Sequence, residues 1–136
     1  MQKPMRHLFL ILSCAVLILA GCSGPKALTK RGGEMQNAGM VKQAAELYYQ
    51  ALRKKPNYID AMIGLRTAGQ GVIDTWVGEF QQASMDGRRK DALDLYDNMS
   101  AYTARISKVD VDLIIPSSIV SDYEDHLDEH LIELDE

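Results

Sequence analysis

Apolar residues recur three or four positions apart through most of the chain after residue 27, which is the period of an amphipathic helix. Pro56 and the turn at Gly87 interrupt this pattern, and Asn57 is a suitable N-cap for the segment that follows Pro56. The pattern predicts helices over residues 28–38, 41–54, 58–85 and 92–108. We therefore expect an all-α protein.

The third of these helices is expected to be unusually long. Its apolar face continues to Met85, although glycines interrupt it at positions 64, 69, 71 and 78. Glycine costs a helix interior about 1 kcal/mol relative to alanine, so the segment either breaks near Gly69 to Gly71 or uses its glycines for close helix contact. We favour one long helix in which the glycines permit a kink.

The chain changes character after Lys108. Residues 109–115 first alternate between apolar and acidic side chains and then become continuously apolar. This pattern predicts a short extended segment that ends at Pro116. A last amphipathic helix follows from Ser117. Its apolar stripe consists of Ile119, Val120, Tyr123, Leu127, Leu131 and Leu134. We expect this helix to lie against the preceding helices or against a partner.

An internal repeat is visible at a spacing of 48 residues. Gly39, Ala44, Leu47, Tyr48 and Ala51 recur as Gly87, Ala92, Leu95, Tyr96 and Met99. The first unit resembles a tetratricopeptide repeat, whose small, aromatic and turn positions match Gly32, Gly39, Ala44, Tyr48, Ala51 and Pro56.

This resemblance implies stacked antiparallel helix pairs over residues 27–108, in which small residues let helices approach and an aromatic ring fills the gap. That family repeats every 34 residues, so the surplus here is close to four helical turns and would lengthen a helix without rotating its buried face. Leu28 replaces the usual early Trp, and Met35 stands where an aromatic is common. The alternative is a generic helical bundle.

The N-terminus has the layout of a secretory signal. Lys3 and Arg6 precede an uncharged, mainly apolar run over residues 8–19. As a helix this run would be only ~18 Å long, which is too short to span a hydrocarbon core of ~30 Å. The run ends in Leu19-Ala20-Gly21-Cys22, which resembles the lipobox of bacterial lipoproteins. The alternative is an ordinary secretory signal with a cysteine at this position by chance.

The lipobox resemblance implies that residues 1–21 are removed and that Cys22 becomes a lipid-bearing N-terminus. Two or three acyl chains anchor a protein stably, so we expect a bacterial envelope protein held at its membrane by this covalent lipid. Ser23 favours the outer membrane, because an aspartate there resembles an inner-membrane retention signal. Residues 22–26 form the lipidated terminus and a short linker, and residues 109–136 form an acidic C-terminal segment. No thiol remains for a disulfide or a cysteine metal site.

Charge divides at residue 109. Residues 22–108 hold thirteen basic and nine acidic residues, whereas residues 109–136 hold ten acidic and none that is Lys or Arg. The simpler interpretation is a solvated acidic helix face; the sharper one is a tail that folds over a basic groove and competes with an acidic partner. The groove would be formed by Arg53, Lys54, Lys55, Arg88, Arg89 and Lys90. Nucleic acid is not expected as a partner outside the cytoplasm.

Residues 126–130 match the H-x-x-E-H pattern of inverted zinc proteases. His126 and His130 share a helix face and could hold a metal, with Glu129 as general base. Such a match arises easily by chance among alternating acids, so a solvated face is the preferred interpretation. No other catalytic constellation stands out, and we do not expect an enzyme or a cofactor beyond the covalent lipid.

These features favour a non-catalytic interaction scaffold or assembly factor for an envelope complex. A stack of fewer than three clear repeats needs neighbours to cover its open faces. The cover is either the last helix, an envelope protein or a second copy of the chain. The alternative function is ligand or cation binding by the acidic C-terminal segment.

Overall fold

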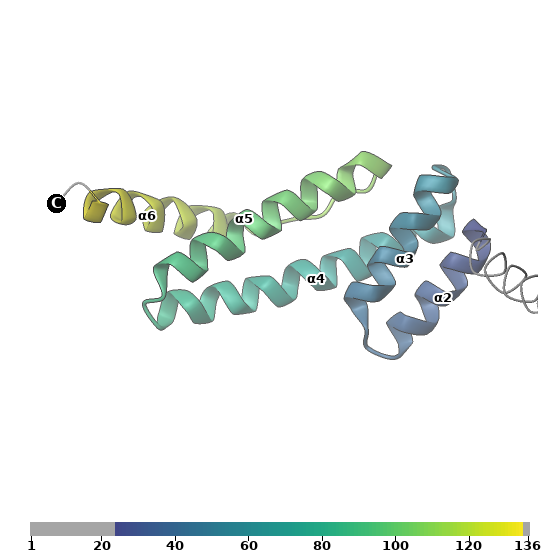
Figure 1. Cartoon of the computed structure of the whole chain (residues 1–136), viewed down its shortest axis with the longest axis horizontal. Coiled ribbons are helices and arrows are strands. Elements are labelled where there is room, and N and C mark those ends of the chain that lie inside the picture. Colours follow the sequence, from purple (N-terminus) through teal and green to yellow (C-terminus); the bar gives the residue numbers. More distant parts are fainter. Residues whose placement is uncertain (1–23, 135–136) are drawn as a thin grey trace, which may run out of the picture.

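The computed structural model describes residues 24–134. Its elements are α2 (Pro25–Asn37), α3 (Val41–Lys54), α4 (Ile59–Met85), α5 (Arg89–Ile106), the 3-10 turn η1 (Ser107–Val109) and α6 (Ser117–Leu134) (Figure 1). The prediction of an all-α fold is confirmed, since residues 24–134 contain no strand. The predictions of a signal peptide over residues 1–21 and of lipid on Cys22 lie outside the described residues.

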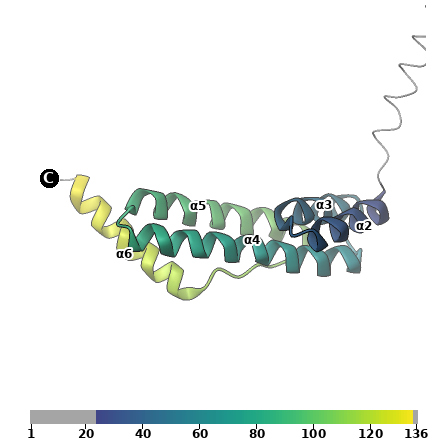
Figure 2. The same cartoon turned by 90° about the horizontal axis from the view of Figure 1, so that it is seen from below.

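The long helix α4 organises the molecule. Helices α2 and α3 form a hairpin beside its first half, α5 returns along it, and α6 lies against its far end and extends away from the body (Figures 1 and 2). Each helix lies against the next in the chain, and α2 also touches α4. Among residues 24–134, no helix is both long enough and apolar enough to cross a membrane.

Helix boundaries follow the sequence with three differences. The N-cap of α4 is Tyr58, without a side-chain hydrogen bond, so the prediction of Asn57 as N-cap is wrong. Helix α2 begins at Pro25 rather than Leu28, because proline suits the first helical turn and the Leu28 N–H donates to the Gly24 carbonyl at 3.0 Å. Helix α5 begins at Arg89 rather than Ala92 and tightens into η1 at its end. Helix α4 is continuous, so the expectation of one long helix is confirmed.

The 48-residue repeat appears as two identical turns. Gly39 and Gly87 have φ of +76° and +68°, the left-handed region that glycine adopts without strain. In both turns the glycine N–H and the next N–H donate to the carbonyls three and five residues earlier, which is the Schellman arrangement. The sequence repeat is therefore a repeat of the hairpin geometry.

Helix α4 carries the extra length of the second unit. It has 27 residues against 13 in α2, so the difference equals the surplus of 14 over a standard repeat. Four whole turns keep the buried face aligned. Ala44 and Ala92, which stand at matching positions, are accordingly both 0% exposed. The resemblance to tetratricopeptide repeats in particular stays a prediction.

Tyr48 fills the space between α2 and α4. A Cβ atom on Gly32 would lie 2.8 Å from the ring, and one on Gly64 would lie closer still. The Tyr48 hydroxyl donates to Gln36 Oε1 at 3.1 Å. Burial also raises the pKa of this phenol, which stays neutral at physiological pH. Two glycines thus make the slot that lets three helices meet around one ring.

Tyr96, the equivalent residue in the second unit, is covered differently. Its ring stacks on Tyr123 of α6 with centroids 3.9 Å apart, and Ile119 of α6 is fully buried nearby. Helix α6 therefore covers the far end of the α4–α5 pair, as one of the sequence interpretations expected.

The segment from residue 110 to residue 116 connects α5 to α6 without regular structure. It runs back along α4, where the Leu113 side chain fits against Gly69 (Figure 2). The Gln70 side chain accepts from the Ile114 N–H and donates to the Ile114 carbonyl, both at 3.0 Å. The expected extended segment over residues 109–115 is wrong at its start, because Val109 belongs to η1 and Asp110 is left-handed with φ of 58°; residues 111–116 are non-helical and are held by one amide side chain.

Substituting Gly64 by alanine tests the Tyr48 slot. The new methyl group would overlap the Tyr48 ring, which cannot move away because Gly32 closes the other side. We expect Gly64→Ala to lower the free energy of unfolding by about 1–3 kcal/mol, measured by urea denaturation.

Gly78→Ala is the matched control, because a Cβ atom there meets nothing within 4 Å. Alanine should stabilise this exposed position of α4 by about 0.5–1 kcal/mol through higher helix propensity. Equal effects of the two substitutions would contradict the slot.

Candidate functional site

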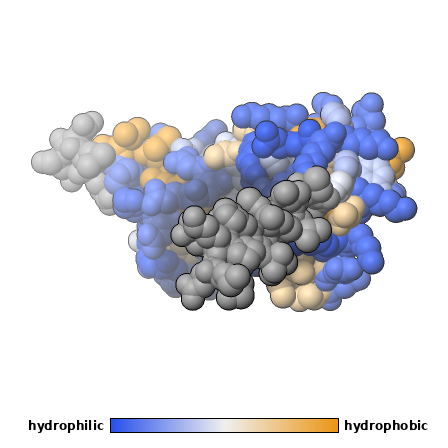
Figure 3. Space-filling model, turned by 45° about the vertical axis from the view of Figure 1, so that its right-hand side comes forward, coloured by the Kyte–Doolittle hydropathy of each residue, from blue (hydrophilic) through white to orange (hydrophobic). Residues whose placement is uncertain are grey.

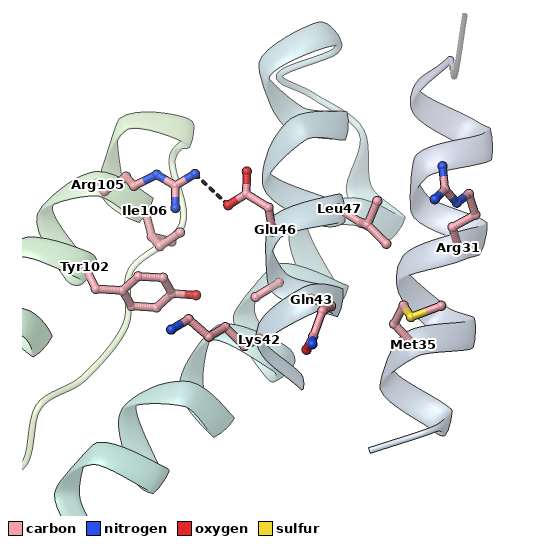
Figure 4. A pocket seen from close by; sticks show the side chains of 10 residues that line it. Arg31, Met35, Lys42, Gln43, Glu46, Leu47, Tyr102, Arg105 and Ile106 are labelled. Carbon is pink, nitrogen blue, oxygen red and sulfur yellow. Dashed lines mark hydrogen bonds and ion pairs between the residues drawn. The ribbon is translucent and has the colours of Figure 1, made fainter. Parts of the chain in front are cut away.

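A hollow of the described surface lies between α2, α3 and the end of α5 (Figure 4). We call it the interhelical groove; its volume is about 590 Å³. It is lined by Arg31, Met35, Lys42, Gln43, Ala45, Glu46, Leu47, Tyr102, Arg105 and Ile106.

The groove exists because α5 and α2 approach opposite sides of α3 near its first turns. Glu46 of α3 joins α5 through an ion pair with Arg105, whose Nη2 lies 2.6 Å from the carboxylate. Met35 and Leu47 face each other across the α2 side in Figure 4. The floor is therefore apolar, while the charged groups stand at its edges.

Aromatic rings fix the α5 wall. The rings of Trp76 and Tyr102 meet edge to face with centroids 5.4 Å apart, and the Lys42 ammonium lies 5.6 Å from the Trp76 ring centre. The Arg105 guanidinium lies 4.3 Å above the Tyr49 ring. Both cations are thus positioned by ring faces as well as by charge.

The groove edge is mainly positive. Arg31, Lys42 and Arg105 contribute three cations, and Glu46 contributes the single carboxylate of the lining. The hydrogen bond that Arg105 donates to the Glu46 carboxylate raises the pKa of the Arg105 guanidinium, which stays charged at physiological pH. Such a groove suits apolar groups accompanied by a negative charge.

The six predicted partner-binding cations do not form one groove. Arg53, Lys54 and Lys55 stand before α4, and the other three follow it. A helix of 27 residues rises about 40 Å, so the clusters lie at opposite ends of α4. The expectation of a single basic groove under the acidic tail is corrected accordingly, because helix length separates what the sequence suggested grouping.

The second cluster is already engaged with carboxylates. Arg88 pairs with Asp86 at 3.1 Å and Asp91 at 2.9 Å, and both hydrogen bonds raise its pKa. Lys90 pairs with Asp94 at 2.7 Å. Arg89 pairs with Glu129 of α6 at 2.9 Å, which is how the acidic helix meets this basic run.

The candidate metal residues face other groups. His126 Nε2 lies 2.9 Å from the Ser84 hydroxyl, and its ring lies 6.1 Å from that of Phe80. Glu129, the proposed base of the H-x-x-E-H pattern, pairs with Arg89. The part of the chain that the structure describes holds no group of three or more potential ligands around His126 or His130.

Comparison with known proteins gives no assignment. No protein-family model matches the chain, and no curated protein or solved structure is significantly similar to it.

The interhelical groove was not predicted from the sequence. Glu46 and Arg105 are 59 residues apart, so no local motif announces their pairing. A weak signal was the pair of polar residues Lys42 and Gln43 directly before Ala44. In the structure these two are exposed and Ala44 is buried, so they mark the border of the apolar face.

Tyr102 gives a measurable property of the groove. Burial raises the pKa of its phenol above the ordinary value of 10.0. The folded state therefore holds this proton more tightly than the unfolded state, so the stabilisation is complete below pH 10.0 and is lost as pH rises further.

We expect Tyr102→Phe to flatten the alkaline fall in melting temperature, measured by circular dichroism above pH 10.0, while leaving the neutral value nearly unchanged. Superimposable alkaline profiles for the two proteins would contradict a buried Tyr102 hydroxyl.

Proposed function

We propose that the protein is a lipid-anchored, non-catalytic scaffold of the bacterial envelope that binds a segment of a partner protein in the interhelical groove. The observation that carries this proposal is the groove itself, which lies at the hairpin end of the molecule and has a volume of about 590 Å³. Its floor is apolar and cations stand at its edge. Helix α6 covers the opposite end, which supports α2 and α3 as the proposed site for a partner (Figure 1).

The groove defines the chemistry of the partner segment. Met35 and Leu47 would receive apolar side chains, as when an amphipathic helix enters a hydrophobic groove. Arg31 and Lys42 favour an acidic residue beside them. A small amphipathic anion is the second candidate, because the volume lies within the ~300–1,000 Å³ of ligand pockets.

The lipid anchor is tested on the whole precursor in bacteria. We expect the chain to incorporate labelled palmitate and to fractionate with the outer membrane, because Cys22 follows a lipobox-like sequence and is followed by Ser23. Cys22→Ser should abolish labelling and release the protein from membranes. Labelling that persists in Cys22→Ser would contradict this assignment.

Partner binding is tested by crosslinking in intact cells followed by mass spectrometry. Gln43→Trp places a bulky ring in the groove from an exposed position of α3. We expect it to lower recovery of the specific partner at least about tenfold, the equivalent of losing about 1.4 kcal/mol of binding.

Gln81→Trp is the matched control, since Gln81 is exposed on the far half of α4. It should leave partner recovery unchanged. Recovery that falls equally with both variants would contradict the groove as the binding site. Recovery of a small anion in place of a protein would favour the second candidate.

A further inference from the structure

Positive charge gathers at the end of the domain where the described chain begins, at Gly24. Helix α2 begins there, α3 ends there and α4 begins there (Figure 2). We call this the anchor-proximal surface; it consists of Lys26, Lys30, Arg53, Lys54, Lys55, Ile59, Ile63 and Arg66. We propose that it binds the anionic lipid headgroups of the membrane that holds the protein.

Contacts between helices bring the start of α2, the end of α3 and the start of α4 together. The starts of α2 and α4 border one hollow of about 630 Å³, which is lined in part by Lys26, Lys30, Tyr58 and Asp60. The Lys55 ammonium lies 5.1 Å from the centre of the Tyr58 ring. Tyr58 thus links the α2 lysines to the basic end of α3, with Asp60 as the carboxylate among them.

Exposed apolar side chains stand beside the cations. Ile59 is 67% exposed and Ile63 is 59% exposed, and their spacing of four places them on one face of α4. In Figure 3 the coloured part of the surface is mostly hydrophilic, with apolar areas confined to separate places. Isoleucines contribute nothing to binding a free phosphate, whereas a bilayer interface receives both apolar side chains and long basic ones.

The place of Cys22 in the sequence, just before the described chain, points to a membrane as the occupant. Ser23 alone stands between it and Gly24 in the sequence, and an extended chain reaches at most ~3.6 Å per residue. A lipid on Cys22 would therefore hold the start of α2 within roughly 10 Å of the headgroups. This inference rests on the proposed anchor for its setting.

The opposite end of the molecule has a different electrostatic character. Arg88, Arg89 and Lys90 are paired with carboxylates, and α6 adds acidic residues there. Among residues 24–134, Lys26, Arg53 and Arg66 make no ion pair. An anionic bilayer would attract the anchor-proximal surface and repel α6, so the long axis would point away from the membrane.

The test uses the mature chain from residue 22 with Cys22→Ser, which retains every described helix and carries no lipid. We measure its binding to vesicles of phosphatidylcholine alone and of phosphatidylcholine with phosphatidylglycerol. We expect binding only to the anionic vesicles, weakening steeply as salt rises from about 0.05 to about 0.5 M.

Paired variants locate the binding surface. Lys26→Gln with Lys30→Gln should weaken binding about 25-fold, since each basic residue near an anionic surface contributes about a factor of five. Arg88→Gln with Lys90→Gln removes the same charge at the far end and should leave binding within about twofold. Circular dichroism checks that both variants fold.

A single label reports orientation. The Cys22→Ser chain has no other thiol, so an environment-sensitive dye can be attached at Ile63→Cys or at Ser121→Cys. We expect a spectral shift on anionic vesicles at position 63 and none at position 121, which is exposed on α6.

Each outcome decides the inference. Anionic-specific binding that is lost only in the Lys26 and Lys30 variant supports it. Absence of binding, equal binding to neutral vesicles, equal loss in both paired variants or a shift at position 121 overturns it. Because this chain lacks the lipid, failure here leaves the palmitate test of the proposed anchor independent.

Discussion

The Tyr48 ring between Gly32 and Gly64 is the contact on which the arrangement of the first three helices depends. Because Gly32 and Gly64 have no Cβ atoms beside the ring, α2 and α4 both lie close to α3. Close approach of α2 and α4 brings their starts together, and the same hairpin sets the side of α3 that faces α5. Both the interhelical groove and the anchor-proximal surface therefore follow from one aromatic ring and two missing methyl groups.

The length of α4 sets the second constraint. Its extra 14 residues carry the chain past the hairpin, so residues 24–134 form two cores along one helix. Trp76, Tyr102 and Leu113 border both cores and connect them. The second core lies between α4 and α5 and needs a third helix to cover it. Helix α6 covers it and stacks Tyr123 on Tyr96.

Local structure was largely predictable from the sequence, because helix periodicity and its stops at Gly39, Pro56 and Gly87 act within a few residues. The early start of α2 was missed because a proline read as a linker residue also suits a first helical turn. The positions of the helices relative to one another were harder to predict from the sequence. The basic clusters were grouped although α4 separates them, and the groove depends on Glu46 meeting Arg105 across 59 residues.

The amide of Gln70 has a consequence for how the return segment is aligned. Because it engages both backbone groups of Ile114, it fixes the register of residues 110–116 along α4. A slip of one residue would present the Asp112 carboxylate to Gly69 in place of the Leu113 side chain, burying a charge in an apolar contact. One side chain thereby determines which residues of a segment without regular structure become part of the core.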